Sequence, residues 1–263
     1  FILKPSEQTA LSALKIAEYL KESGLPDGVF SVVNGSRDAV ESICDHPDIK
    51  AVAFVGSSNV AKIVYSRSSA NGKRALCLGG AKNHMIVVPD ADQDSTAKGL
   101  LASSMGSAGQ RCMAASVAVG VADIDSIIEQ LVEEAKAFEL GIDMGTIISR
   151  SALDRITSYI DDAEKMGAQV LVDGRDATPP AGYENGYWLG VTVLDGVDPD
   201  WPCAKEEIFG PVLSIIRTET LEDAMRIEND NQYGNAAAVF TTSGDVAKTI
   251  SETASAGMIG INI

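Results

Sequence analysis

The sequence contains no apolar run that approaches the roughly 20 residues needed to span a bilayer. Its first residues, 1–16, also lack the basic-then-apolar layout of a secretion signal. We therefore expect no membrane segment, and a cytoplasmic location or, in a eukaryote, the mitochondrial matrix. The sequence does not begin with Met, and residues 257–263 resemble a strand with nothing after it. These two features predict that the chain starts and stops inside a larger fold.

Cysteine and basic residues are both scarce. The four cysteines, Cys44, Cys77, Cys112 and Cys203, include no CxxC pair, so we expect no zinc or other metal site. A cytosolic chain of this size does not need disulfides, which leaves a cysteine free to act as a nucleophile. Lys and Arg number 21 against 37 acidic residues, and the net charge of −16 argues against a nucleic-acid partner.

Apolar runs alternate with segments of helical period along the whole chain. We predict strands at 29–33, 52–55, 74–78, 85–88, 117–121, 169–172, 212–216, 237–240 and 257–263. We predict helices at 9–23, 38–44, 58–68, 94–105, 124–138, 151–166, 220–229 and 244–254, and a Gly- and Pro-rich loop at 173–187. This order is typical of α/β proteins with parallel sheets. We expect two doubly wound lobes with mainly parallel sheets, residues 1–80 and 81–263, which meet near the glycines of 79–82.

Cys112 follows a stretch of small residues, 103–109, which allows the backbone to approach a ligand closely. Arg111 places a positive charge beside the thiol, where it favours the reactive thiolate. The alternative is that Cys112 is a buried core residue, as many cysteines among small residues are. For Arg111 the alternative is a structural role in which backbone carbonyls accept its hydrogen bonds.

Two segments near predicted strand ends have the residues of a nucleotide site. Lys4 and Glu7 follow the opening strand, at the end where open α/β sheets bind ligands. The same segment also fits a plain helix start, with Ser6 or Thr9 as the cap. Gly56 separates a strand from a helix and is a possible phosphate cradle or simply a tight turn, and no GxGxxG fingerprint is present. A further polar segment, 205–211, leads into a strand.

These four segments, in this order and spacing, resemble the signature stretches of the aldehyde dehydrogenase superfamily. The resemblance covers the whole chain and is closest to the CoA-acylating methylmalonate-semialdehyde (malonate-semialdehyde) dehydrogenases. It rests on Gly80-Ala-Lys-Asn-His84, Val88-Pro-Asp-Ala91, Gly109-Gln-Arg-Cys-Met113, Gly182-Tyr-Glu-Asn-Gly186, Lys205-Glu-Glu-Ile-Phe-Gly-Pro-Val-Leu213 and Tyr233-Gly-Asn235. It implies the fold of that family truncated at both ends, with residues 1–80 as the second half of the NAD-binding domain and 81–263 as the catalytic domain.

The resemblance also implies roles for residues in the first lobe. Lys4 and Glu7 correspond to residues that bind the adenosine ribose of NAD. Gly56 and Ser57 correspond to the turn that meets the pyrophosphate, although Ala61 stands where many relatives have a second glycine. A carboxylate at Glu7 would repel a 2′-phosphate, which favours NAD over NADP.

In the second lobe the resemblance implies that Cys112 is the catalytic nucleophile. Glu207 corresponds to the glutamate that holds the nicotinamide ribose, and Phe209 to the ring lying against the nicotinamide end. Arg111 is a candidate partner for a substrate carboxylate. The oxyanion would be stabilised by backbone N–H groups near Cys112 and by a side-chain amide that we expect upstream of Phe1.

One departure from the hydrolytic pattern bears on the reaction. Hydrolytic members carry a glutamate at the position of Leu78, and the neighbouring Cys77 is no carboxylate either. The absence of a base at this position therefore favours acyl transfer from Cys112 to CoA. The resemblance implies NAD as the oxidant and methylmalonate or malonate semialdehyde as the substrate. Two alternatives are a hydrolytic enzyme with a base elsewhere and a non-catalytic module with the same fold. We expect a homo-oligomer, tetramer or dimer, for the full-length protein and little activity from these 263 residues alone.

Overall fold

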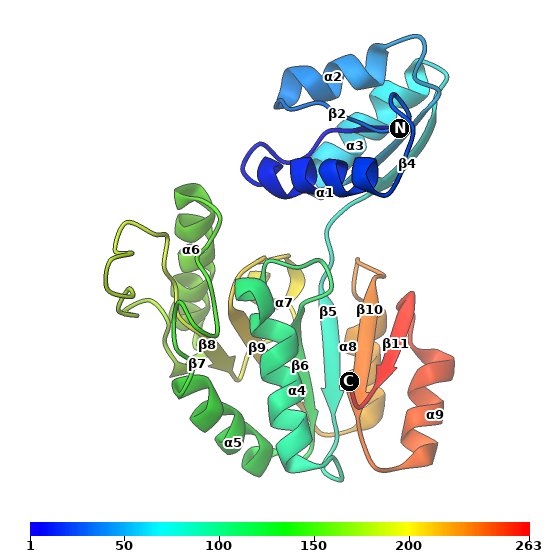
Figure 1. Cartoon of the computed structure of the whole chain (residues 1–263). Coiled ribbons are helices and arrows are strands. Elements are labelled where there is room, and N and C mark those ends of the chain that lie inside the picture. Colours follow the sequence, from blue (N-terminus) through cyan, green and yellow to red (C-terminus); the bar gives the residue numbers. More distant parts are fainter. The chain divides into compact units, whose positions relative to one another are not determined.

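The computed structural model describes all 263 residues, Phe1–Ile263. The chain divides into two compact units, Phe1–Gly80 and Ala81–Ile263, and the break lies within the glycine-containing segment 79–82 (Figure 1). Strands and helices alternate in both units, which confirms the α/β class. No helix combines the length and the apolar composition that a membrane crossing requires.

Unit 1 alternates short strands with helices. Its elements are β1 (Ile2–Leu3), α1 (Ala10–Glu22), β2 (Ser31–Val32), α2 (Arg37–Asp45), β3 (Ala51–Val55), α3 (Ser58–Ala70) and β4 (Arg74–Leu78). The strands form two separate parallel pairs, β1 with β2 and β3 with β4, each joined by the helix between its strands. Within this unit the expected wound sheet is therefore present as two two-stranded pieces.

The α1 helix has the predicted position, but its apolar stripe is not covered in unit 1. Leu11 is 82% exposed and Ile16 is 52% exposed, and Ala13 is the one buried residue of the helix. The hydrophobic period predicted the helix correctly. The same period could not show that much of the apolar face of α1 is exposed to solvent in this chain.

Unit 2 is built on a seven-stranded sheet with the strand order β11-β10-β5-β6-β9-β8-β7. Its elements are β5 (Asn83–Val87), α4 (Gln93–Met105), the 3₁₀ turn η1 (Gly106–Gly109), β6 (Ala115–Val121), α5 (Asp125–Lys136), α6 (Arg150–Met166), β7 (Gln169–Val172), β8 (Thr192–Asp195), α7 (Pro202–Lys205), β9 (Val212–Thr218), α8 (Leu221–Asn229), β10 (Ala236–Phe240), α9 (Gly244–Thr253) and β11 (Met258–Ile261). All neighbours are parallel except β7 and β8. The mainly parallel sheet is confirmed.

Helices cover both faces of this sheet. In Figure 1, α4 lies in front of the sheet and α8 behind it. The central strand β5 is buried along its whole length, with Ile86 and Val87 fully inaccessible. Parallel strands covered on both faces are typically apolar runs, and β5 follows this pattern from Met85 to Val87, after the buried polar residues Asn83 and His84. The main hydrophobic core consists entirely of unit 2 residues.

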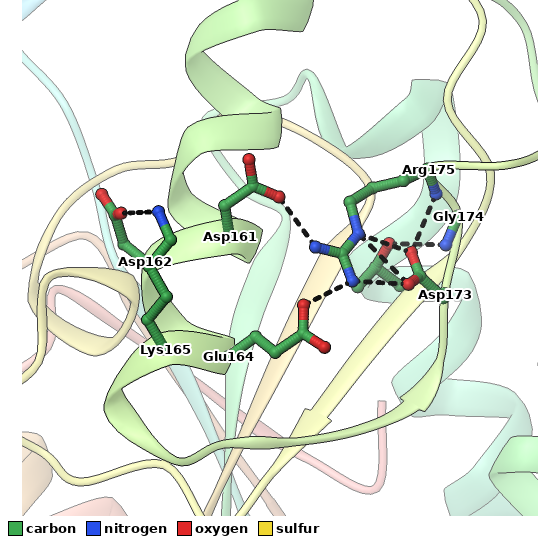
Figure 2. A network of polar contacts seen from close by, with 8 residues as sticks. Asp161, Asp162, Glu164, Lys165, Asp173, Gly174 and Arg175 are labelled. Atoms are coloured by element: carbon green, nitrogen blue, oxygen red, sulfur yellow. Dashed lines mark hydrogen bonds and ion pairs between the residues drawn. The ribbon is translucent and has the colours of Figure 1, made fainter.

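The predicted loop 173–187 contains no helix or strand, but it is fixed to α6 by an ion cluster (Figure 2). Arg175 pairs with Asp161 and Glu164 of α6 at 2.7 Å each, and with Asp173 at 2.6 Å. The Gly174 N–H donates to the hydroxyl of Thr192 in β8 at 3.1 Å. One guanidinium with a planar fork of donors thus organises three carboxylates and anchors the start of the loop.

Candidate active site

The predicted site residues fall into two groups, one in each unit. Unit 1 contains Lys4, Glu7, Gly56 and Ser57, and unit 2 contains Arg111, Cys112, Glu207 and Phe209.

Lys4 and Glu7 lie between β1 and α1, at the carboxyl end of the β1–β2 pair. The Lys4 Nζ donates to the carbonyl of Gly35 at 2.7 Å and lies 3.6 Å from the Glu7 carboxylate. The Glu7 side chain is 60% exposed, so it is accessible to a ligand. Thr9 precedes α1 without a side-chain capping bond, but the Ser6 hydroxyl accepts from the N–H of Gln8 at 3.3 Å, so the helix-start alternative stays open for Ser6.

Gly56 and Ser57 form the turn between β3 and α3. A Cβ at Gly56 would lie 2.6 Å from the tip of the Phe54 ring, so a larger residue here would have to displace that ring. Ser57 precedes the 13-residue helix α3 and makes no side-chain capping bond. The amino end of the helix therefore has main-chain N–H groups that no side chain of Ser57 satisfies, and such an end suits a phosphate group.

The segment before Cys112 has an unusual backbone. Ser107, Ala108 and Gly109 all have left-handed φ angles, 55°, 54° and 67°. A Cβ at Gly109 would lie 2.0 Å from the carbonyl oxygen of Gly210. Glycine is therefore required at 109 for both its conformation and its contact, and that contact packs the cysteine segment directly against the segment that contains Glu207 and Phe209.

Cys112 is exposed, whereas Cys44 and Cys203 are buried. This excludes the alternative in which Cys112 is a core residue. Its carbonyl oxygen accepts hydrogen bonds from two side-chain amides, Asn83 Nδ2 and Asn235 Nδ2, each at 2.9 Å. The Cys112 N–H takes part in none of the main-chain hydrogen bonds of this segment. The residue thus combines an accessible thiol, an anchored carbonyl and a free N–H donor.

Arg111 caps the carboxyl end of α4. Its Nη2 donates to the carbonyls of Ala102 at 2.9 Å and Ser103 at 2.8 Å. These contacts are those of the structural alternative for Arg111, and a cation is favourable at a helix carboxyl end. The side chain is nevertheless exposed, and its other guanidinium nitrogens make no hydrogen bond within the chain.

The segment between α7 and β9 is anchored at several points. The Glu207 carboxylate accepts from the N–H of Ala81 at 3.1 Å, and its main-chain carbonyl accepts from Arg155 at 3.4 Å. The Tyr159 hydroxyl donates to Glu206, and burial followed by this hydrogen bond raises the pKa of Tyr159 to about 12. Phe209 is 37% exposed and has a left-handed φ of 54°. A bulky residue held in that conformation is characteristic of ligand sites.

The unit 2 residues gather at one end of the sheet. Cys112 precedes β6, Glu207 and Phe209 precede β9, Asn83 begins β5, and Asn235 precedes β10. These four strands are parallel neighbours in the order β10-β5-β6-β9, so their amino ends meet. This is opposite to the carboxyl-end rule, which the unit 1 residues follow.

Sequence reasoning did not assign a role to Asn83, Asn235 or Lys82, although all three lie in motif segments. Lys82 is fully buried, donates to the carbonyl of Cys203 at 2.7 Å, and has its pKa lowered by burial to about 8. The sequence feature that could have pointed to these residues is their place in the motif segments 80–84 and 233–235. The partners of a side-chain amide cannot be read from one sequence because they lie far away along the chain. No group of three or more His, Cys, Asp and Glu side chains is suited to hold a metal ion.

Fold and site together define an α/β protein with a glycine-containing strand–helix turn in one unit and, in the other, an exposed cysteine whose main-chain carbonyl is anchored. Comparison with known sequences gives the family. The profile of the aldehyde dehydrogenase family matches residues 1–263, and the chain belongs to this family.

Individual relatives are similar over the whole chain. A rat mitochondrial methylmalonate-semialdehyde/malonate-semialdehyde dehydrogenase, described as acylating, is 44% identical over 100% of the chain and 50% of its own length. The crystal structure of methylmalonate-semialdehyde dehydrogenase from Oceanimonas doudoroffii has a TM-score of 0.96 at 44% identity, covering 100% of this chain and 55% of that one. A Mycobacterium tuberculosis aldehyde dehydrogenase complexed with NAD⁺ has a TM-score of 0.92 at 34% identity, covering 99% and 55%. The chain spans about half the length of the curated relatives it matches.

Proposed function

We propose that this chain is part of an NAD-dependent dehydrogenase that oxidises methylmalonate or malonate semialdehyde and transfers the acyl group from Cys112 to CoA. The observation that carries the proposal is the exposed Cys112 with its anchored carbonyl, in a chain 44% identical throughout to an acylating relative. In this proposal residues 1–80 are the second half of the NAD-binding domain and residues 81–263 are the catalytic domain.

The residues of each unit suit the part of NAD assigned to them. In unit 1, the exposed Glu7 and the neighbouring Lys4 offer a carboxylate and an ammonium to ribose hydroxyls, and the α3 amino end after Gly56 and Ser57 offers N–H groups to the pyrophosphate. In unit 2, Glu207 is held for the nicotinamide ribose and Phe209 offers an exposed ring face. When bound, NAD supplies the acceptor for the hydride that leaves the aldehyde carbon.

Cys112 starts the reaction. Its thiolate bonds to the aldehyde carbon, and the π electrons of the carbonyl move to oxygen to give a thiohemiacetal oxyanion. The free N–H of Cys112 is a donor for that oxygen. When the oxyanion re-forms its double bond and the carbon loses hydride, Cys112 holds the acyl group as a thioester.

The fate of the thioester depends on what can attack it. Leu78 ends β4, is 51% exposed and has no group that can accept a proton from water. General-base assistance is worth about 10²–10⁴-fold, so hydrolysis without it is slow. The thiol of CoA ionises without a strong base, attacks the thioester carbon and releases the Cys112 thiolate.

Loss of the substrate carboxylate precedes this transfer. The bond between the α-carbon and the carboxylate breaks, the carboxylate leaves as CO₂, and the α-carbon keeps the electron pair and gains a proton. Addition of water to the CO₂ gives bicarbonate. Arg111 is our candidate to hold the carboxylate. It has guanidinium nitrogens left over after it caps α4.

Two further proposals concern the whole protein. The edge strand β11 has one unpaired side, and Met258 and Ile261 within it and Ile263 after it are exposed. Unpaired apolar edges favour association, so we infer a homo-oligomer, a dimer or tetramer, for the complete protein. We also infer a cytoplasmic location or the mitochondrial matrix, the latter in line with the name of the rat relative.

The test uses the complete gene product that contains this chain, incubated with NAD and methylmalonate semialdehyde, with and without CoA. We expect propionyl-CoA that requires CoA, detected by mass spectrometry. The Cys112→Ser variant should lose about 10⁴-fold or more of the turnover and still bind NAD. The Cys77→Ser variant is the matched control and should keep its activity.

Each alternative has a distinct outcome. Free acid formed at the same rate without CoA would support the alternative that the protein is a hydrolytic aldehyde dehydrogenase. A native protein that shows no turnover and a Cys112 that resists iodoacetamide would support the non-catalytic module.

A further inference from the structure

The carbonyl of Cys112 is held by two asparagine side chains that come from different strands. Asn83 begins β5, and Asn235 immediately precedes β10. Each donates from Nδ2 to the Cys112 oxygen at 2.9 Å. Two donors use both lone pairs of the carbonyl, which fixes the plane of the 112–113 peptide.

Asn83 connects three parts of unit 2. Its Nδ2 also donates to the carbonyl of Ala114 at 2.9 Å, and its Oδ1 accepts from the N–H of Ala236 at 3.1 Å. The side chain is buried, so these bonds replace water entirely. Asn83 therefore ties the cysteine segment on both sides of Met113 to the first residue of β10.

Asn235 has a simpler role, because its side-chain hydrogen bonds all involve the cysteine segment. Its Nδ2 donates to Cys112 and lies 3.2 Å from the sulfur of Met113. The side chain is half-buried. Substitution at this position therefore removes support from Cys112 without leaving an unpaired group in the core.

The support is needed because the preceding backbone is strained. Residues 107–109 are all left-handed, a conformation that is unfavourable for the non-glycine residues Ser107 and Ala108. A strained segment persists only where its surroundings hold it. Gly109 against Gly210 holds the near side of this turn, and the two asparagines hold the far side at Cys112.

We propose that Asn83 and Asn235 are positioning residues that fix the main chain at Cys112, so that its Sγ and its N–H keep one orientation toward the aldehyde. This inference rests on the proposed function, in which Cys112 is the nucleophile. Misplacing a reacting atom by about 1 Å can cost about 10²-fold in rate. The asparagines act through Cys112 and do not themselves touch the reacting atoms.

The experiment compares Asn235→Ala with the control Asn229→Ala in the complete gene product. Asn229 also donates from Nδ2 to a carbonyl, that of Thr253 at 3.1 Å, and its Oδ1 accepts from Ser255 at 2.7 Å, away from Cys112. The readouts are the NADH burst of the first turnover, the Kd for NAD, the thermal midpoint, and the pH profile of Cys112 alkylation by iodoacetamide.

For Asn235→Ala we expect a burst rate lowered about 10- to 100-fold. The Kd for NAD and the alkylation profile should stay near wild type, because a small diffusing reagent does not need the sulfur to be aimed. Asn229→Ala should keep the burst rate, whatever its effect on the thermal midpoint. Asn83→Asp retains an acceptor for Ala236 but loses both donors, and should show the same loss of burst as Asn235→Ala.

A wild-type burst in Asn235→Ala would overturn the inference, and so would a burst that falls only in proportion to the loss of thermal stability in both alanine variants. Failure of the proposed function has a different result. If Cys112 is not the nucleophile, the Cys112→Ser variant keeps its NADH burst. If Cys112→Ser is inactive while Asn235→Ala is fully active, the proposed function stands and only the positioning role is refuted.

Discussion

At the scale of single residues, the start of β5 places charge-bearing side chains in a dry interior. His84 is 4% exposed, and its pKa is lowered to about 4 by burial and then by the positive charge of Lys82. Its Nδ1 lies 3.3 Å from the amide nitrogen of Asn231, a contact that requires an unprotonated Nδ1. The folded protein therefore holds His84 neutral.

This burial predicts how stability depends on pH. Between pH 6.5 and 4 the unfolded chain binds a proton at His84 that the folded chain does not, so the free energy of unfolding falls as pH falls through this window. The loss between pH 7.5 and 5 should be about 2 kcal/mol. In urea titrations at these two pH values, His84→Gln should remove most of that difference.

The matched control is His46→Gln, because His46 is an exposed histidine of unit 1. The acid sensitivity assigned to His84 should persist in this variant, since His84 is unchanged. An unchanged slope in His84→Gln would contradict the assignment of the acid sensitivity to His84.

Sequence alone identified Cys112 as a candidate but could not show what holds it. Asn83 is 29 residues from Cys112 and Asn235 is 123 residues from it. A one-dimensional pattern contains no information on which distant amide meets which carbonyl. The roles inferred for Lys4, Glu7, Glu207 and Phe209 stay predictions, since they rest on resemblance and await the binding experiments.

At the scale of elements, most of the predicted helices and strands are present, and the departures are confined to a few short elements. The helix predicted at 151–166 is α6, and the strand predicted at 74–78 is β4. The predicted strand at 29–33 is reduced to the two residues of β2, and β8 and α7 were missed. β8 ends on the buried Asp195, which is stabilised by Arg217 of β9 at 2.8 Å, a pair that sequence patterns do not reveal.

The contact between α6 and the loop 173–187 depends on Arg175. Replacing Arg175 by Met leaves Asp161, Glu164 and Asp173 facing one another without a cation. We expect a loss of about 1 kcal/mol in unfolding free energy, smaller in high salt, since networks exceed isolated surface pairs. Hydrogen exchange in residues 173–187 should become faster.

The control for this variant is Arg150→Met. Arg150 forms a single exposed pair with Asp154 on the same helix, and losing it should cost less than about 0.5 kcal/mol. Equal effects of the two substitutions would show that the ion cluster adds nothing beyond a surface pair.

At the scale of the whole molecule, hydrophobic burial is unequal between the units. The buried hydrophobic residues of unit 1 are Ala13, Cys44, Ala61 and Val64, all of them small or medium in size. Its strands form two isolated pairs, and two-stranded sheets are marginal by themselves. Unit 2 contains the seven-stranded sheet and the whole of the main core.

We therefore predict that residues 81–263 fold without residues 1–80. Expressed alone, they should give dispersed amide resonances and one cooperative thermal transition. Residues 1–80 alone should show neither feature. A cooperative thermal transition in the isolated segment 1–80 would contradict this prediction. So would the lack of such a transition in the isolated segment 81–263.

The four strand starts that surround Cys112 have a consequence for the newborn chain. During translation, Cys112 is synthesised 123 residues before Asn235. Ala236, whose N–H donates to Asn83, is added directly after Asn235. Synthesis proceeds at about 5–20 residues per second, so the thiol spends several seconds outside the tunnel before its second amide exists. If Cys112 acts as proposed, its geometry is complete only after Asn235 has been synthesised and β10 has joined the sheet.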